Sequence, residues 1–362
     1  MILYFKNNLF LFLSLFLALI LIALSKFPLT EIPTLVDWKT ILSLSGLILI
    51  TTAIKESGAF YYFSYFIASN IRNERILSLF FVVFTAFIAT FLTNDISLFI
   101  VVPITLTLQD ILQKKLAKLV IFEIIAANVG STLTPIGNPQ NLFLWHQWEI
   151  SFLTFIEIMF PLFLLLLILL VLFVFFLIPS EKISKMSKVK ISFFKKDFVV
   201  AMFFFVLFLC FLEFDQINFL IFLILIFALF FRKILFKCDW GLIFLFILIF
   251  INIKLIFYLK FLNIFFNNLL IKSSKYVFIT SALASQIFSN VPAAIFLVNY
   301  STNLKAIAYG VNVAGNGLVF ASLANLIGLR LYSKRDIYLL FHLYSIPYFL
   351  ISFILSLIIF FH

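Results

Sequence analysis

Charged residues are scarce in this chain. They make up 11% of its 362 residues, whereas hydrophobic residues make up 65% and the mean hydropathy is +1.22. A soluble core of this size could not bury so much apolar surface, which excludes a soluble globular protein. Because the apolar runs recur from end to end, the sequence predicts an all-α polytopic protein that lies in a lipid bilayer.

Cysteine and histidine are also rare. Cys210 and Cys238 have no CxxC spacing, and the three histidines are far apart and form no HExxH motif. Neither a disulfide nor a thiolate or imidazole metal site is indicated. The sequence shows no paired catalytic acids and no Ser/Lys arrangement. We therefore expect no enzyme activity and no cofactor other than a bound Na⁺.

Positive charge is the one charge in excess, with a formal net charge of +11. In a soluble protein this excess would suggest a nucleic acid partner, but here the Lys and Arg residues lie in short loops between apolar runs. A bias of basic residues toward the cytoplasmic side of a membrane explains this placement. The sequence therefore predicts no nucleic acid partner.

About nine apolar runs are predicted to cross the membrane completely. The first is predicted to be a retained helix, because no small-residue cleavage site of a signal peptide follows it. The predicted crossings are 9–25, 38–54, 119–145, 154–178, 197–212, 217–231, 240–258, 306–330 and 337–361.

Two further apolar stretches, 76–108 and 276–303, each contain two apolar arms around a polar tip. The tips are Thr93 to Asp95 and Ser289 to Pro292. Polar, broken backbone is tolerated at membrane depth only where it is buried in protein or lines a cavity. Each stretch is therefore predicted to be a re-entrant hairpin that enters and leaves the membrane on one side.

The distribution of basic residues supports the two hairpins. If the N-terminus is cytoplasmic and the C-terminus outside, most of the 26 basic residues fall on the cytoplasmic side, and reading either hairpin as a crossing removes this bias. The location predicted is the cell (inner) membrane. The cytoplasmic basic residues are Lys6, Lys55, Arg72, Arg75, Lys114, Lys115, Lys118, Lys182, Lys185, Lys188, Lys190, Lys195, Lys196, Arg232, Lys233, Lys237, Arg330, Lys334 and Arg335.

Two polar segments share one spacing. Asn128 precedes Asn141 by the same distance by which Asn312 precedes Asn325, and each segment interrupts a crossing, 119–145 or 306–330. Hairpin and broken helix thus recur in the same order. The sequence predicts two inverted repeats, 1–178 and, after a Lys-rich cytoplasmic linker 179–196 and an extra helix, the remainder of 197–362. Such repeats are typical of secondary transporters. Amphipathic stretches 59–71 and 261–271 precede the hairpins.

The polar motifs of the first half follow one another as Asn94-Asp95 with Pro103, Ala127-Asn128-Val129-Gly130-Ser131, and Ile136-Gly137-Asn138-Pro139-Gln140-Asn141. In this order they resemble the ion transporter superfamily. That group contains arsenical pump permeases, sodium/proton antiporters, citrate transporters and divalent anion:sodium symporters. The resemblance covers nearly the whole chain from about Val36 onward.

In the divalent anion symporters, a Ser-Asn-Thr motif at each hairpin tip faces the substrate, and each tip binds Na⁺ together with the neighbouring broken helix. The resemblance also implies a homodimer. This sequence departs from the motif, because Asp95 stands in the first tip and Val291 replaces the hydroxyl in the second. The Asn94-Asp95 pair is more similar to the arsenical permease branch.

These arguments give two sets of candidate residues. For substrate binding they are Thr93, Asn94, Asn138, Ser289, Asn290 and Ser322. For cation or proton binding they are Asp95, Asn94, Asn128, Ser131, Thr132, Gly137, Asn141, Asn290, Asn312, Asn316 and Asn325. Their oxygen and amide groups suit a hard monovalent cation or a polar anion rather than a soft metal.

Asp95 is the most informative candidate. An aspartate at membrane depth costs about 3 kcal/mol or more unless it is protonated, paired or bound to a cation. One interpretation is a carboxylate that binds H⁺ or Na⁺; the other is a neutral cap on the second hairpin arm. Glu123 is open to a role in proton transfer or to a structural role between helices.

The leading hypothesis is a secondary active transporter in which Na⁺ or H⁺ drives a small inorganic or carboxylate anion, or an oxyacid, across the membrane by alternating access. The main alternative is a sodium/proton antiporter in which Asp95 exchanges the two ions. An arsenite-type efflux permease, a passive channel and an intramembrane enzyme are further alternatives.

Overall fold

The computed structural model describes residues 9–362 except 184–191, 215, 260–272 and 333–335. Within these ranges the chain is built of helices, with one isolated β-bridge between Asn73 and Lys182. Five of the helices in the described ranges are long and apolar enough to cross a membrane, namely α3, α5, α6, α9 and α19. The predicted fold class, an all-α polytopic membrane protein, is confirmed.

The described part of the first half contains nine helical segments, and the predicted hairpin and broken helix are both present. The hairpin 76–108 consists of α5 and α6, which meet at Thr93, and the broken helix 119–145 consists of α7 and α8. The short 3-10 helix η1 was not predicted. The segments are α2 (Leu9–Ser25), η1 (Leu29–Leu35), α3 (Trp38–Glu56), α4 (Ala59–Ala68), α5 (Glu74–Leu92), α6 (Asn94–Leu112), α7 (Ala117–Gly130), α8 (Pro139–Trp148) and α9 (Phe152–Leu177).

The second half repeats this order. The hairpin 276–303 consists of α15 and the short α16, and the broken helix 306–330 consists of α17 and α18. The predicted stretch 261–271 and most of the Lys-rich part of the linker lie outside the described residues. The segments are α10 (Lys195–Glu213), α11 (Ile217–Phe230), α12 (Arg232–Leu235), α13 (Trp240–Tyr258), α15 (Ser274–Phe288), α16 (Asn290–Leu297), α17 (Leu304–Val313), η2 (Val319–Ala321), α18 (Leu323–Tyr332) and α19 (Ile337–Phe360).

The two Asp-Trp pairs start corresponding helices in the same way. Asp37 caps α3 and Asp239 caps α13, and each carboxylate accepts a hydrogen bond from a backbone N–H three residues on. The indoles of Trp38 and Trp240 each donate to a carbonyl oxygen five residues earlier. Two distant sequences thus build one local structure twice, which supports a repeat.

The two hairpin tips also have one backbone conformation. Thr93 has φ 82° and ψ 149°, and Ser289 has φ 79° and ψ 154°. Residues other than glycine rarely adopt a positive φ, so its recurrence at both tips indicates a shared way of turning from one arm into the other. That the halves have opposite orientations in the membrane stays a prediction, as do the repeat boundaries.

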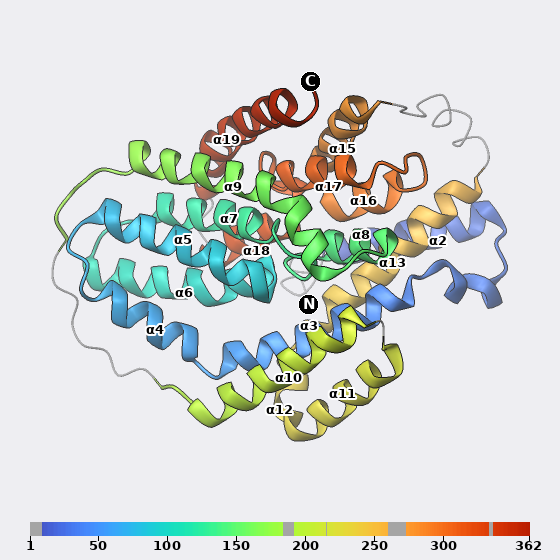
Figure 1. Cartoon of the computed structure of the whole chain (residues 1–362), viewed down its shortest axis with the longest axis horizontal. Coiled ribbons are helices and arrows are strands. Elements are labelled where there is room, and N and C mark those ends of the chain that lie inside the picture. The colour runs from blue at the N-terminus through green and yellow to red at the C-terminus, as the bar shows by residue number, and fades with distance from the viewer. Residues whose placement is uncertain (1–8, 184–191, 215, 260–272, 333–335) are drawn as a thin grey trace.

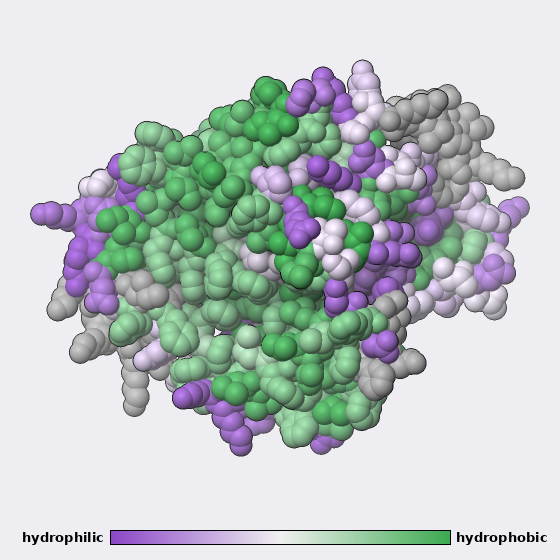
Figure 2. Space-filling model, viewed as in Figure 1, coloured by the Kyte–Doolittle hydropathy of each residue, from purple (hydrophilic) through white to green (hydrophobic). Residues whose placement is uncertain are grey.

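The helices form two groups in space (Figure 1). The first group packs α3 against α10 and α11, and α2 along α13; we call these five helices the frame. The second group contains both hairpins and both broken helices, with α9 and α19 beside them. Hydrophobic residues cover much of the face seen in Figure 2, and hydrophilic residues gather mainly at its left and right sides, with smaller patches at the top and bottom. This distribution suits a protein surrounded by lipid.

The open end of the first hairpin is held by charges. Lys114, between α6 and α7, lies 2.6 Å from Glu181 of the linker and also contacts Glu74 at the start of α5. Hydrogen bonds from Lys114 to the carboxylates of Glu181 and Glu74 raise the pKa of Lys114, so it stays protonated. The pairs tie both hairpin arms to the chain that follows α9.

Each hairpin is pressed onto its broken helix at a glycine. A Cβ atom on Gly130 of α7 would lie 2.0 Å from the carbonyl oxygen of Ala86 in α5, and one on Gly310 of α17 would lie 2.6 Å from that of Phe278 in α15. The neighbours are backbone atoms, which cannot turn aside. The hairpins and the broken helices therefore have close, glycine-dependent contacts.

We expect Gly130→Ala to lower stability by about 1–3 kcal/mol or more, because the new methyl group overpacks the α5–α7 contact. Thermal unfolding of the purified protein in detergent measures the loss. Gly241→Ala in α13 is the control, since its nearest neighbour, the Asp239 carboxylate, is 3.1 Å away and can move. Equal melting temperatures of the two variants would contradict the close contact.

Candidate functional site

Asparagine side chains form hydrogen bonds with the free backbone groups at the break between α7 and α8. Asn138 caps α8 by accepting a hydrogen bond of 2.8 Å from the backbone N–H of Asn141. The Asn141 amide nitrogen donates to the carbonyl oxygens of Ser131, Thr132 and Thr134 at 3.1, 3.1 and 3.2 Å. Carbonyl groups freed by a break need such partners at membrane depth, because lipid supplies none.

The carbonyl oxygens of the second break are satisfied in a similar way, by an asparagine and by one additional residue. Asn325 donates to the carbonyl oxygens of Gly315 and Leu318 at 2.9 and 3.3 Å. Gln286 of α15 donates to those of Ala314 and Asn316, both at 2.8 Å. Gln286 was not among the predicted residues, although an amide three residues before a hairpin tip could have indicated it.

The two breaks bind each other through the asparagines that share one spacing. Asn128 donates to the side-chain oxygen of Asn325 at 2.8 Å, and Asn312 donates to that of Asn141 at 2.7 Å. The first asparagine of each broken helix thus pairs with the last asparagine of the other. Asn138 adds a third link, donating to Asn312 at 3.0 Å.

Asn128 is the centre of this network. Its amide nitrogen also donates to the carbonyl oxygen of Gly315 and the side-chain oxygen of Asn316, at 3.1 and 3.2 Å. Its side-chain oxygen accepts hydrogen bonds from Ser322 at 3.1 Å and from Asn94 of the first hairpin tip at 3.4 Å. Predicted residues from both halves therefore meet at one buried point.

The remaining predicted residues lie around this point. The hydroxyls of Ser131 and Thr132 donate to the carbonyl oxygen of Asn128 at 3.0 Å, and the carbonyl oxygen of Gly137 accepts from the backbone N–H of Asn94 at 2.9 Å. At the second tip, Ser289 lies 3.4 Å from Asn290 and 3.5 Å from the carbonyl oxygen of Ala321, and both tip residues are buried.

Asp95 is buried but does not cap its helix. The Thr93 hydroxyl accepts the capping hydrogen bond from the backbone N–H of Ile96 at 3.4 Å. The Asp95 side chain is 7% exposed, and its Oδ1 atom has no hydrogen-bond partner among the described residues. The capping interpretation of Asp95 is therefore not supported by the geometry, and a buried oxygen without a partner is costly unless something binds it.

A cavity of about 120 Å³ lies beside Asp95, between the first hairpin tip and the frame. The lining of this cavity includes Thr93, Asp95 and Phe99 from the hairpin, Thr52 and Lys55 from α3, and Lys237 and Asp239 from the segment that leads into α13. Lys55 and Lys237 were not predicted as site residues, because they lie far from the tip in sequence and were assigned to loops.

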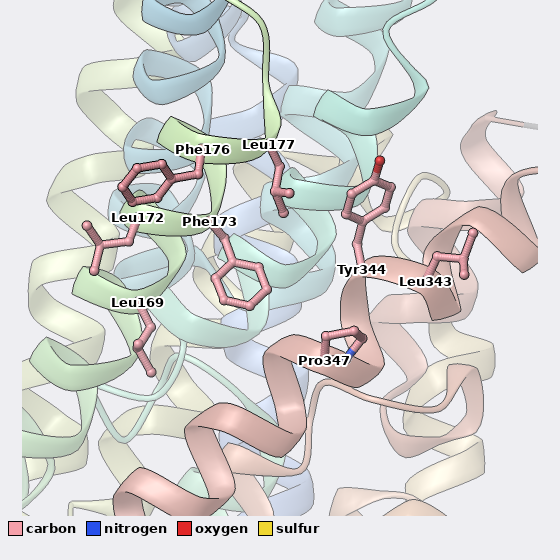
Figure 3. Close-up of a pocket in the computed structure, with 8 residues that line it drawn as sticks. All are labelled: Leu169, Leu172, Phe173, Phe176, Leu177, Leu343, Tyr344 and Pro347. Carbon is pink, nitrogen blue, oxygen red and sulfur yellow. The ribbon is translucent and has the colours of Figure 1, made fainter.

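A larger groove of about 460 Å³ lies between α9 and α19. In Figure 3, Phe173 and Leu177 of α9 lie on the side of that helix toward Tyr344 and Pro347 of α19. Apart from the Tyr344 hydroxyl its lining is apolar. A polar substrate has little to bind here, and the groove suits contact with lipid.

A second carboxylate is buried in the broken helix. Glu123 of α7 accepts a short hydrogen bond from the Thr105 hydroxyl of α6, and its Oε2 atom has no hydrogen-bond partner in the described part of the chain. The Thr105 bond links α6 to α7, as a structural role requires. The free oxygen leaves a role in proton transfer open.

The family follows from comparison with known proteins. Residues 9–325 match the citrate transporter family, and this span includes both hairpins and most of both broken helices. The chain belongs to the citrate transporter family. Its predicted place in the ion transporter superfamily is thereby confirmed, and the protein is a membrane transporter.

Several relatives carry transporter or membrane-protein names. The chain is 37% identical over 317 residues to the inner membrane protein YbiR of Escherichia coli, covering 87% of this chain and 85% of that protein. It is 37% identical over 308 residues to the uncharacterized transporter MJ0456 of Methanocaldococcus jannaschii, covering 83% of each. A shorter match, 26% over 124 residues, is to the P protein of Mus musculus, covering 34% of this chain and 15% of that protein.

We expect Asn128→Leu to lower the melting temperature in detergent strongly. The leucine is similar in size but leaves buried partners in both breaks unsatisfied, at about 1–3 kcal/mol for each. Asn299→Leu is the control, since among the residues that the structure describes the Asn299 amide bonds only to carbonyl oxygens three and four positions earlier. If Asn128→Leu melted like the control, the network would not be what holds the two halves together.

Proposed function

We propose that this protein is a secondary active transporter in which Na⁺ or H⁺ drives a small anion or oxyacid across the cell (inner) membrane by alternating access. The single observation that carries this proposal is Asp95, a carboxylate at the first hairpin tip with a buried oxygen and no partner in the described residues. A group kept there despite its desolvation cost should bind a charge that comes and goes during the cycle.

The first break offers oxygens for Na⁺. The carbonyl oxygens of Ser131, Thr132 and Thr134 converge on one atom, the amide nitrogen of Asn141. Hard cations prefer such oxygens, so Na⁺ can take the place of the amide when Asn141 turns away. In this proposal cation binding also breaks the bond between Asn141 and Asn312, and so reaches the second half.

The place of the cavity supports movement of the hairpins against the frame. It lies between Asp95 of the first hairpin and residues of α3 and α13, which belong to the frame. In the proposed cycle the hairpins and broken helices move as a unit, with 59–71 and 261–271 as connecting arms, and the frame faces lipid or a second copy in a homodimer. Alternating access by such motion is typical of transporters with repeats.

The second candidate function is a sodium/proton antiporter. The buried carboxylate of Glu123, which also has an oxygen without a partner in the described ranges, favours it, because ion exchange needs groups that titrate inside the membrane. Proteoliposomes separate the two functions. Na⁺ flux driven by a pH gradient alone indicates the antiporter, and Na⁺ flux that depends on an added anion indicates the symporter.

We expect Asp95→Asn to abolish gradient-driven accumulation of labelled phosphate, sulfate or citrate in proteoliposomes, whichever of these the wild-type protein transports. The asparagine keeps the size of the side chain but cannot bind a proton or neutralise a cation. Exchange of internal for external anion should survive, because it requires no net movement of the coupling ion.

Asp110→Asn is the matched control, since Asp110 lies on the same helix but is exposed near its far end. It should accumulate anion like the wild-type protein. Accumulation by Asp95→Asn with an unchanged dependence on pH and Na⁺ would show that Asp95 does not carry the coupling charge.

A further inference from the structure

We propose that Lys55 and Lys237 bind the transported anion in the cavity beside Asp95, and that Asp95 admits the anion only after H⁺ or Na⁺ has neutralised it. This inference rests on the proposed function and adds an anion site to it. The chain has no Lys or Arg near either hairpin tip in sequence, so the positive charge must come from elsewhere.

The fold brings that charge to the first tip. Lys55 comes from the last turn of α3 and Lys237 from the segment between α12 and α13, and both line the cavity together with Asp95. The Lys55 ammonium group lies 5.5 Å from the centre of the Phe99 ring, which is one helical turn beyond Asp95 on α6. Lys55 therefore belongs to the frame and Lys237 to the segment that leads into α13 of the frame, whereas the tip that faces them belongs to the hairpin.

Both lysines are paired with one partly exposed carboxylate in this structure. Glu56 lies 3.4 Å from Lys55 and also contacts Lys237. The Glu56 side chain is 27% exposed, and ion pairs so close to solvent are weak. An anion that enters the cavity can therefore draw the lysines from Glu56 at little cost.

The charges that line the cavity make binding of the anion depend on prior binding of the cation. Two ammonium groups, Lys55 and Lys237, face two carboxylates, Asp95 and Asp239. Asp239 is engaged in capping α13. Glu56, which pairs with both lysines, adds a third carboxylate. While Asp95 is ionised, the carboxylates outnumber the ammonium groups and Asp95 repels an anion; when Asp95 holds a proton or Na⁺, the two remaining carboxylates balance the two lysines. Loss of this repulsion inside one partly buried cavity favours binding of the anion after the cation.

The size of the cavity indicates the class of anion. A volume of 120 Å³ corresponds to about four water molecules. It accommodates a small oxyanion such as phosphate or sulfate, for which the Thr52 and Thr93 hydroxyls on the lining are suitable donors. Citrate is a much larger anion with three carboxylates, so we expect it to bind less well here than phosphate or sulfate. The site is thus predicted to select small oxyanions over tricarboxylates.

The experiment measures binding without a gradient. The melting temperature of the purified protein in detergent is followed against phosphate, sulfate and citrate, with and without Na⁺, at pH 6 and pH 8, with chloride at equal ionic strength as the reference for general salt effects. We expect a saturable rise with phosphate or sulfate, but not with citrate, that requires Na⁺ or the lower pH. Asp95→Asn should show the rise at pH 8 without Na⁺.

Matched variants test the two lysines. Lys55→Gln and Lys237→Gln should each weaken the apparent affinity about tenfold or more, the loss of about one good charge pair. Lys55→Arg, which keeps the charge, should retain most of the affinity. Glu56→Gln removes the present partner of the lysines and should bind the anion as well as the wild-type protein or better. If the lysines served only to hold Glu56, Glu56→Gln would instead behave like Lys55→Gln.

Four outcomes would overturn the proposal. They are unchanged affinity in Lys55→Gln and Lys237→Gln, weakened affinity in Glu56→Gln, tighter binding of citrate than of phosphate and sulfate, and no saturable shift in the melting temperature of the wild-type protein with any of the three anions. Melting temperatures without anion identify variants that are merely unstable. Binding that follows the prediction in a protein that accumulates nothing in proteoliposomes would refute the proposed function alone.

Discussion

The structure depends on one constraint: a helix that breaks inside a bilayer must find hydrogen-bond partners within the protein. Here the partners are asparagine amides. Asn141 satisfies the carbonyl oxygens of the first break, and Asn325 those of the second. Each of the two then accepts a bond from the asparagine that starts the other broken helix, Asn312 or Asn128. The side chains that satisfy each break therefore have partners in the other half, so the two breaks stabilise each other.

The same network is suited to change. Hydrogen bonds between helices in a membrane contribute on average about 0.6 kcal/mol each, because the alternative arrangements also find partners. Asparagine offers both donors and an acceptor, so a rotation of its amide can exchange one set of partners for another. A cation that takes over the carbonyl oxygens around Asn141 would thus cost little in lost bonds while altering the link to Asn312. Stability and motion draw on the same residues.

The sequence alone predicted the helices, the hairpin turns and the breaks, because apolar periodicity and polar interruptions are local properties of the chain. The number of full crossings stays a prediction, since α5 and α6 of the first hairpin are also long and apolar enough to span a membrane. The equal spacing of Asn128 to Asn141 and of Asn312 to Asn325 indicated a repeat, but not that each asparagine would pair with one from the other half. The cavity was not predictable in this way, since Lys55 and Lys237 reach Asp95 only through the packing of distant segments. Gln286 was missed for the same reason, as its partners lie in the next broken helix.

The two halves share a backbone design but not a chemistry. At the first tip a carboxylate follows Asn94, whereas at the second tip the apolar Val291 follows Asn290 in the same backbone conformation. Of the two tips, the first carries the titratable group, and lysines from the other side of the cavity face it. The proposed change of charge therefore takes place in the first half. The second half would then respond through the asparagines rather than bind a coupling ion of its own. The pairs that join Asn128 to Asn325 and Asn312 to Asn141 are neutral amides, so they can pass the change from one half to the other by exchanging hydrogen-bond partners without themselves carrying a charge.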